Sequence, residues 1–430
     1  MRYLNKFNLI YNHQYGFRKE HNISHPLLHF LDKIYDSFNK PTPEYNIAIF
    51  IDLKKAFDTC DPNILLKKLE YYGFRGMSNK WFENYLKGRY QYTCVNGAQS
   101  KLKEISCGVP QGSILGPILF LLLINDLPNA SKILFTLLYA DDTTLQNSSP
   151  NLNELILQTN EELEKISDWF KANKLTLNTA KTKYMVFNPK NDNRVNSNLT
   201  KLHIENVNID RIGKDCESES FKFVGINIDE NLKWDKHIEH IRNKLLSANY
   251  ALSKTKNILP TKIKMKIYNS LFKSHLEFGM LSWGPFSEIE VHRLVQIQKK
   301  AVRNIAGVKS NSHTDPLFAE LKILKAPDLL QMNMLSFMYK YDSKKVPPSF
   351  ENHFTPLINY ERSKNYHLIN VKCKKLQKFP SYSLPKRWNE LSLDEKRINS
   401  LSSFKKIFKL QVLSKYNQVC TAKSCFICKS

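Results

Sequence analysis

The chain has 430 residues, of which 42% are hydrophobic, and its 64 Lys and Arg against 40 Asp and Glu give a formal net charge of +24. This length and apolar content predict roughly two to four domains and exclude a disordered chain. The positive charge favours a polyanionic partner, with nucleic acid first and an acidic membrane surface second. Residues 361–430 hold half of the net charge, with 16 basic and 4 acidic residues, as expected of a segment that binds phosphates.

The N-terminal part of the chain predicts a strand and two helices. The apolar residues of the first 17 positions are interrupted throughout, which excludes a signal peptide. The stretch "YNIAIFID", residues 45–52, predicts a buried strand that ends in an acid. Asp61 and Pro62 predict the cap and first turn of a helix. Ser78 predicts the cap of a second helix, whose apolar stripe comprises Trp81, Phe82, Tyr85 and Leu86.

A hairpin and a buried helix are predicted next. Asn96-Gly97 lies between two alternating segments, "RYQYTCVNG" and "KLKEISCG", which indicates a β-hairpin. The segment "VPQGS", residues 109–113, precedes a helix that runs up to Pro128. This helix contains the longest apolar run of the chain, residues 118–124, which is far too short to span a bilayer.

Two strands flank a pair of adjacent acids. "ILFTLLY" and "TTL" predict strands on either side of Asp141 and Asp142. An amphipathic helix is expected over residues 151–173, and "KYMVF", residues 183–187, is another strand. A polar stretch then predicts a boundary near residue 195.

The second half of the chain is predicted less completely. "FKFVGINI" indicates short strands, and helices are expected from about residue 235 to 307. Residues 311–430 mix short helical patterns with Pro and basic clusters, to which the sequence alone assigns no fold.

Cys425 and Cys428 form half of a zinc site, but no His follows, so we expect no zinc there. The chain has eight cysteines, and the five before Cys420 are scattered, which favours reduced thiols in an intracellular protein. Because the sequence shows no signal peptide and no apolar run long enough to span a bilayer, we expect the nucleus or the cytoplasm and no membrane partner.

The aspartates raise a question of electrostatics. Two adjacent acids in a turn are by themselves more often an ordinary surface feature than a catalytic one. If the strand ending at Asp52 neighbours the strands around Asp141 and Asp142, three carboxylates meet at one sheet edge. Divalent cations resolve such repulsion, because Mg²⁺ prefers carboxylate and phosphate oxygens. Two ions about 3.5–4 Å apart can activate a hydroxyl and stabilise leaving pyrophosphate, which is polymerase chemistry.

Four ordered blocks resemble a known family. "FIDLKKAFD", "GVPQGSILGPILF", "YADD" and "LNTAKTKYMVF" are similar to the palm of reverse transcriptases, most of all those of non-LTR (LINE-type) retrotransposons such as the jockey group. "QYGFR" resembles a fingers element, and "FKFVGINIDENLKWDKHI" resembles the strands that grip the primer. "SHLEFGMLSWG", "LVQIQKKAVRNIAG" and "KRWNELSLDEKRINSLSSFKKIFK" are similar to regions that follow the palm.

The resemblance implies a metal site. Asp52 and Asp141 match the two metal ligands, and Asp142 supports the same site for Mg²⁺ or Mn²⁺, two ions in all. The backbone at Leu53 would lie close to the triphosphate. Lys181 matches the lysine beside the pyrophosphate, where it can act as general acid, and Lys183 is the competing candidate.

The resemblance also implies a nucleotide pocket. Phe57 matches the aromatic gate that excludes a ribose 2′-OH, although a Phe there is by itself more often a core residue. Gln111 matches the residue that contacts the incoming nucleotide and template, with Gly112 allowing close backbone approach. Arg18 is a candidate for contact with the template or phosphate. The partners implied are an RNA template, a DNA primer and dNTPs.

The fold class implied is α+β, a right-hand polymerase palm with an antiparallel sheet and partial fingers, followed by a mostly helical thumb and a basic C-terminal region. The expected domains are partial fingers, palm, primer-grip strands with thumb, and a C-terminal region of unassigned fold, at 1–44, 45–192, 193–310 and 311–430. The family carries more fingers sequence before "QYGFR", and an endonuclease domain usually comes first. We therefore expect an N-terminally truncated chain with a well-formed palm and weak or absent activity.

Three alternatives remain at this level. RNA-dependent RNA polymerases typically have Gly-Asp-Asp and a polar residue that accepts the 2′-OH, against which "YADD" and Phe57 argue. A group II intron maturase is compatible with "YADD", but the block around Trp234 favours the retrotransposon. A catalytically dead fragment or relic would bind RNA or DNA only, and the intact acids argue against long decay.

Overall fold

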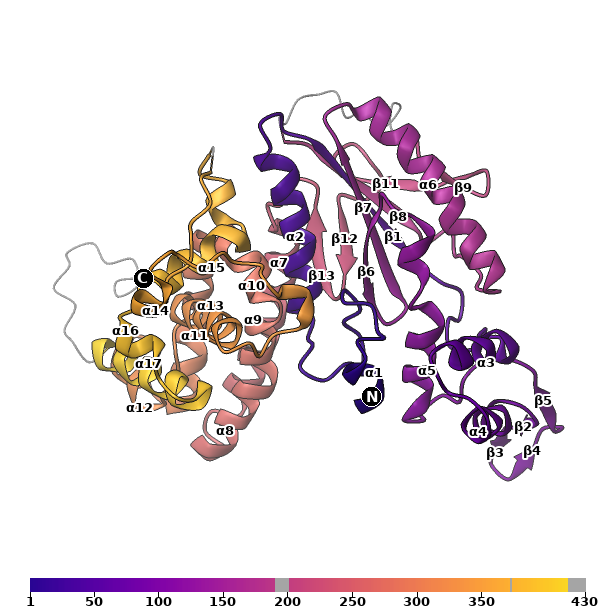
Figure 1. Cartoon of the computed structure of the whole chain (residues 1–430). Coiled ribbons are helices and arrows are strands. Elements are labelled where there is room, and N and C mark those ends of the chain that lie inside the picture. The colour runs from indigo at the N-terminus through magenta and orange to yellow at the C-terminus, as the bar shows by residue number, and fades with distance from the viewer. Residues whose placement is uncertain (190–200, 372, 417–430) are drawn as a thin grey trace. The chain divides into compact units, whose positions relative to one another are not determined.

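The computed structural model describes residues 1–189, 201–371 and 373–416 (Figure 1). It divides into two compact units, which are treated separately below. Unit 1 comprises residues 1–26 and 36–219, and unit 2 comprises residues 27–35 and the described residues from 220 onward. No helix within the described ranges combines the length and the apolarity needed to cross a membrane. The predicted boundary near residue 195 and the Cys425–Cys428 pair lie outside the described residues.

A five-stranded sheet forms the centre of unit 1, with the strand order β11-β8-β1-β7-β6. The strands are β1 Tyr45–Ile51, β6 Phe135–Tyr139, β7 Asp142–Ser149, β8 Lys183–Phe187 and β11 Asp210–Ile212. Every residue of β1 is buried, because β7 and β8 flank it on both sides and apolar side chains cover it. The mixed helix-and-sheet class and the predicted strands are confirmed.

The sheet is not wholly antiparallel, and this part of the prediction is wrong. β11 pairs with β8 in parallel, whereas the other three pairings are antiparallel. A parallel pair requires a long crossover, and residues 188–209 are long enough to provide one. The segment "LNTAKTKYMVF", which contains β8, has no pattern that predicts β11 as its parallel neighbour.

Four long helices accompany the sheet of unit 1: α3 Pro62–Tyr71, α4 Met77–Leu86, α5 Leu115–Ile124 and α6 Leu152–Ala172. α6 runs along the sheet in Figure 1 and contacts β7 and β1. The predicted cap at Ser78 is wrong, because the cap is Gly76, two residues earlier, with a positive φ of 57°, and Ser78 lies inside α4. Its expected apolar stripe is only partly buried, since Leu86 is 1% exposed but Trp81 is 53% exposed and stacks on Tyr85.

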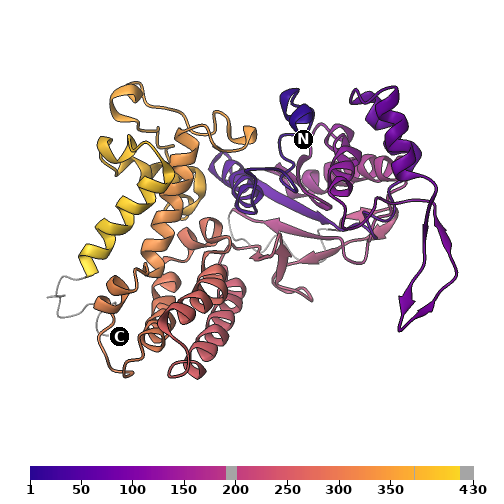
Figure 2. The ribbon, with the colours of Figure 1, turned by 90° about the horizontal axis from the view of Figure 1, so that it is seen from below.

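The predicted hairpin is confirmed as a ribbon of short strands, which projects from the rest of unit 1 in Figure 2. Asn96 and Gly97 have positive φ angles of 50° and 87°, as a two-residue type I′ turn requires. Most side chains of the ribbon are exposed. The paired segments are β2 Arg89–Gln91 with β5 Lys103–Ile105, and β3 Cys94–Val95 with β4 Ala98–Gln99.

Unit 2 contains residues 27–35 of α2 (Ser24–Asn39) and the antiparallel pair β12 Ser220–Phe223 and β13 Ile226–Asp229. Its other described elements are helices. α7 Asp235–Lys254 packs along α11 Glu288–Ala306, and α11 in turn contacts α13 Ala326–Asp342. Residues 311–416, to which the sequence assigned no fold, form helices around α13. These are α12 Asp315–Glu320, α14 Tyr360–Ser363, α15 Pro380–Asn389, α16 Leu393–Lys396 and α17 Leu401–Tyr416, with short turns between them.

A buried amide joins three segments of unit 2. The Gln298 side-chain Nε2 donates to Tyr268 Oη and to the Leu324 carbonyl, each at 2.8 Å. Its Oε1 accepts from the backbone N–H of Ala326 at 3.0 Å. Gln298 is fully buried, so these bonds satisfy polar groups that would otherwise destabilise the core. The same contacts fix the start of α13 against α11.

The cap of α3 provides a test of local stability. Asp61 Oδ1 accepts from the N–H groups of Asn63 and Ile64 at 2.9 and 3.0 Å, and Oδ2 lies 2.7 Å from Lys174 Nζ. We expect Asp61→Ala to lower the free energy of unfolding by about 1 kcal/mol, the usual contribution of a cap. Asp61→Asn should cost less, because it retains a cap oxygen and Lys174 is largely exposed. Urea denaturation of both variants measures this, and equal losses would contradict the capping role.

Candidate active site

Three carboxylates from two strand ends lie together in unit 1. Asp52 directly follows β1, Asp141 is in the turn between β6 and β7, and Asp142 is the first residue of β7. β1 and β7 are hydrogen-bonded neighbours with Ile51 opposite Thr143. Continuing this register by one residue places Asp52 beside Asp142. The structure therefore brings together the three acids that the sequence singled out.

Burial and neighbouring charges shift the pKa values of two of these acids. Desolvation by the surrounding protein, with the charges of Asp141 and Asp52, raises the pKa of Asp142 to about 6. Desolvation raises the pKa of Asp141 as well, with a further contribution from Asp52. The Asp142 residue is exposed, so water is present on one side of the group. Acids that repel one another at a solvent-accessible sheet edge fit the carboxylate set that Mg²⁺ or Mn²⁺ requires.

The turn that carries Asp141 has a strained backbone. Ala140 has a φ of 58°, and Tyr139 pairs with Asp142 across a two-residue turn. Asp141 is not among the residues with positive φ, so the turn has the type II′ pattern, which ordinarily has glycine in its first position. Placing an alanine there costs of order 1–3 kcal/mol. The fixed turn sets the direction of the following carboxylates.

The N-terminal segment supports this turn from the edge of the sheet. Gln14 pairs with Leu138 in a parallel bridge, and its side-chain Oε1 accepts from the N–H groups of Ala140 at 3.1 Å and Gly16 at 2.9 Å. A Cβ atom at Gly16 would lie 2.3 Å from the Ala140 nitrogen. Glycine is therefore required there. Sequence reasoning assigned "QYGFR" to the fingers and missed this contact.

A loop before β8 supports Asp52 from the other side. Asn178 Nδ2 donates to Asp52 Oδ2 at 2.8 Å, and the Asp52 carbonyl accepts from the Asn178 N–H at the same distance. The Asp52 N–H donates to Thr182 Oγ1 at 3.2 Å. Leu53 is buried and forms an isolated bridge with Leu177. Asn178 was missed as a site residue, although it lies within the block "LNTAKTKYMVF" that was recognised.

The two lysine candidates differ in their surroundings. Lys181 is exposed and lies in the loop that contacts Asp52, with its N–H donating to the Asn178 carbonyl at 3.1 Å. Lys183 is in β8 and forms an ion pair with Asp210 of β11. The ammonium group of Lys183 is therefore engaged in the sheet, which favours Lys181.

A cavity of about 330 Å³ contains the expected nucleotide-binding residues. Phe57, Gln111 and Gly112 line it, together with Pro110, Gly116 and Pro117. The Phe57 ring is half-buried against Phe120, with ring centroids 4.7 Å apart. Gln111 Nε2 donates to Asp58 Oδ1 at 2.6 Å. The structure thus brings Phe57, Gln111 and Gly112 together.

The Arg18 side chain contacts backbone carbonyls of the N-terminal segment. One guanidinium nitrogen donates to the carbonyls of Tyr11 and Gln14 at 3.1 and 3.0 Å. Burial lowers the pKa of Arg18. This nitrogen holds the segment that supports the β6–β7 turn, and contact with the template or phosphate stays a prediction.

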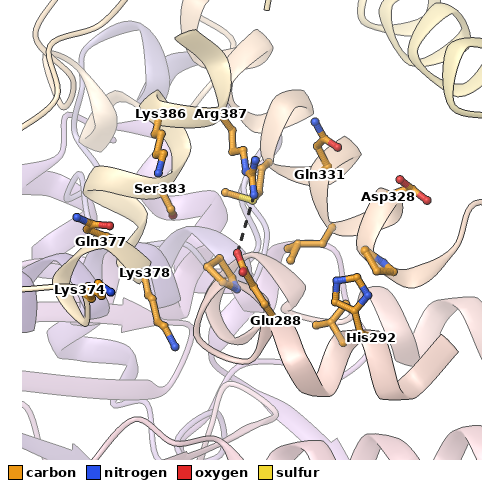
Figure 3. A pocket seen from close by; sticks show the side chains of 15 residues that line it. Glu288, His292, Asp328, Gln331, Lys374, Gln377, Lys378, Ser383, Lys386 and Arg387 are labelled. Atoms are coloured by element: carbon orange, nitrogen blue, oxygen red, sulfur yellow. Dashed lines mark ion pairs between the residues drawn. The ribbon is translucent and has the colours of Figure 1, made fainter. Parts of the chain in front are cut away.

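Unit 2 has a second cavity, of about 460 Å³, with a basic wall (Figure 3). The wall comes from residues 374–387, and the opposite side comes from α11 and α13. Arg387 lies 3.9 Å from Glu288, which neutralises part of the charge. The basic residues on this wall are Lys374, Lys378, Lys386 and Arg387. They belong to the C-terminal region in which the sequence concentrates positive charge.

Comparison with known proteins identifies the family. Residues 1–228, just over half of the chain, match the family described as reverse transcriptase (RNA-dependent DNA polymerase), and the chain belongs to this family. It is 25% identical over 334 residues to the RNA-directed DNA polymerase from mobile element jockey of Drosophila melanogaster, covering 74% of this chain and 34% of that protein. It is 27% identical over 312 residues to the probable RNA-directed DNA polymerase from transposon BS of the same species, covering 68% of this chain and 32% of that protein. These relatives confirm the predicted resemblance.

The chain spans about a third of the length of these relatives. Among solved structures, apo telomerase from Candida tropicalis aligns with a TM-score of 0.38 and 12% identity, over 80% of this chain and 59% of that chain. This likeness is too slight to support any argument about the fold.

The raised pKa of Asp142 predicts how stability depends on pH. The folded protein retains the proton up to about pH 6, whereas an unfolded Asp loses it near pH 4. The contribution of Asp142 to the free energy of unfolding should therefore fall as the pH rises from about 4 to 6 and stay constant above pH 6. Asp142→Asn removes this loss, so without metal it should be more stable than the parent above pH 6, by about 1 kcal/mol after allowance for exposure.

Thermal denaturation in EDTA from pH 5 to 8 measures this difference. The gain from Asp142→Asn should grow up to about pH 6.5 and then remain constant. Asp168→Asn, on an exposed position of α6, is the matched control and should show no such change. A gain of the same size at every pH would mean that the carboxylate is not perturbed as described.

Proposed function

We propose that this chain is an RNA-directed DNA polymerase of a non-LTR retrotransposon, which adds dNMPs to a primer 3′-OH. The observation that supports this most strongly is the convergence of Asp52, Asp141 and Asp142 in a chain of the reverse transcriptase family. The acids are intact and two of them have raised pKa values. This favours an enzyme over a relic that only binds nucleic acid, because binding alone needs no repulsive cluster of acids.

Asp52 and Asp141 would hold two Mg²⁺ or Mn²⁺ ions, with Asp142 supporting the site. When bound, such a pair of ions activates the attacking hydroxyl and stabilises the leaving oxygen. Asn178 holds Asp52 in place through one carboxylate oxygen and leaves the other for a cation. In the reaction the primer 3′-hydroxyl would lose its proton to water and its oxygen would bond to the α-phosphorus, while the bond from the α-phosphorus to the oxygen that bridges to the β-phosphate breaks. Lys181 would give its proton to the departing pyrophosphate.

The cavity at Phe57 would receive the sugar and base of the incoming nucleotide. Phe57 is fixed by Phe120 behind it, so its ring cannot move away easily and would clash with a 2′-OH. Gln111, held by Asp58, would contact the nucleotide and the template. The backbone at Gly112 and at Leu53 would approach the nucleotide and its triphosphate.

We extend the proposal to the architecture and the partners of the chain. Residues 45–192 would form the palm, residues 1–44 part of the fingers, and residues 193–310 the primer-grip strands and thumb, followed by a basic region to 430. The RNA template and the DNA primer would bind along basic surfaces, with the wall at Lys374, Lys378, Lys386 and Arg387 as one phosphate contact. Its place in the C-terminal region supports this use of the positive charge.

Primer extension tests the catalytic role. The parent should extend oligo(dT) on poly(rA) with dTTP and Mg²⁺, and Asp141→Asn should reduce the rate by more than about 100-fold, because a metal ligand contributes several kcal/mol to the barrier. Asp168→Asn makes the same chemical change on an exposed helix position and should retain full activity. No extension by the parent, with binding of the primer–template retained, would favour the relic.

Sugar selectivity tests the role of Phe57. Phe57→Val opens the cavity beneath the sugar, so the preference for dTTP over UTP should fall by about 10- to 100-fold, as loss of one steric contact of 1–3 kcal/mol implies. Phe57→Tyr keeps the ring and should keep the preference. Single-nucleotide incorporation with each triphosphate measures both variants, and an unchanged preference in Phe57→Val would remove the proposed gate.

A further inference from the structure

Unit 2 contains a compact group of three side chains of the kinds that bind transition metals. His29 and Asp32 come from α2 (Ser24–Asn39), and His353 follows the short turn η4 (Pro348–Phe350). One imidazole nitrogen of each histidine and one carboxylate oxygen of Asp32 all lie within 4.8 Å of one another. His29 is 6% exposed and Asp32 is 5% exposed. Two imidazoles and a carboxylate are thus gathered in a nearly dry part of the protein.

The local structure explains why they meet. The spacing of His29 and Asp32 by three residues places both on one face of α2. His353 is turned toward them by Asn352, which has a φ of 59°, and its N–H donates to the Phe350 carbonyl at 3.0 Å. The Phe350 ring lies 4.0 Å from that of His29, centroid to centroid. These contacts bring both imidazoles close to Asp32.

The carboxylate between them is already oriented. Asp32 Oδ2 lies 3.1 Å from His353 Nε2, and Asp32 Oδ1 accepts a hydrogen bond from the Ser381 hydroxyl of α15. Carboxylates that bind metals are usually fixed in this way by a second hydrogen bond. Oδ1 is thereby occupied while Oδ2 faces the imidazoles.

We propose that His29, Asp32 and His353 bind one divalent transition-metal ion, Zn²⁺ before others. Imidazole nitrogens suit Zn²⁺, whereas Mg²⁺ prefers oxygen ligands. Ligand atoms of a tetrahedral zinc site lie about 3.3–3.6 Å apart, given bonds of about 2.0–2.2 Å. The Asp32–His353 distance is close to this already, and small side-chain rotations would bring in His29. The ion would lie between Asp32 Oδ2 and the two imidazoles, and water would fill the fourth position.

Such an ion would connect residues that are far apart in the sequence. It would join α2 to the loop after η4, and through Ser381 to α15. Closing so long a loop is expected to stabilise unit 2. This stabilisation of unit 2 does not depend on the proposed polymerase activity.

Zinc binding is measured on the full chain, with Cys420, Cys425 and Cys428 changed to Ser so that the tail thiols cannot contribute. After removal of metal with a chelator, this parent should bind one equivalent of Zn²⁺ in isothermal titration. Its Tm should rise by roughly 5–10 °C when free Zn²⁺ is 100 times the Kd. Any rise with Mg²⁺ at the same concentration would come from the carboxylates of unit 1, so it should be smaller and equal in the parent and in His353→Gln.

Variants then assign the site. His353→Gln should bind Zn²⁺ at least about 100-fold more weakly and lose the rise in Tm, and Ser381→Ala should bind about 10- to 100-fold more weakly. His367→Gln, an exposed histidine of the same region, is the matched control and should bind as the parent does. Circular dichroism checks folding, and His29→Asn replaces His353→Gln if that variant is unfolded. A parent that binds less than about 0.1 equivalent, or equal binding by the parent and the folded histidine variants, would overturn the proposal.

Discussion

The pairing of β1 with β7 is the constraint on which the candidate active site depends. β1 is buried along its whole length and hydrogen-bonded on both edges, so its register is strongly specified. A slip of one residue would turn its core side chains to the opposite face. The same register carries Asp52 to the edge where the β6–β7 turn presents Asp141 and Asp142. The hydrophobic core thus brings together like charges that would otherwise separate.

The protein supports this unfavourable arrangement with several polar contacts. Gln14 holds the turn at Ala140, and Asn178 holds Asp52. Desolvation and then the charges of Asp141 and Asp52 raise the pKa of Asp142, and a bound cation would offset both effects. Functional sites often contain groups that are unfavourable in the free protein and become favourable when the ligand binds. Because the chain belongs to the reverse transcriptase family, nucleotide addition is the reaction that we propose for this arrangement.

The features that sequence could predict are those that depend on local pattern. The strand ending at Asp52, the Asn96-Gly97 hairpin and the cap at Asp61 follow from alternation, turn chemistry and capping. The supports of the acids could not be predicted in this way, because Gln14 and Asn178 each contact a partner more than 100 residues away in the chain. Among the helices of residues 311–416, α12 and α16 have only six and four residues, α15 has Pro385 inside it, and most of α13 is buried, so an amphipathic period is weak there. The group at His29, Asp32 and His353 forms only through long-range packing.

The central claim is that Asp52 and Asp141 share metal ions during nucleotide addition. Anomalous scattering from crystals of the chain with primer–template, dNTP and Mn²⁺ tests it most directly, because manganese is located without reference to any assumed mechanism. The account predicts two peaks about 3.5–4 Å apart, both in contact with these carboxylates. Nucleotide bound with manganese elsewhere, and no peak between Asp52 and Asp141, would contradict it.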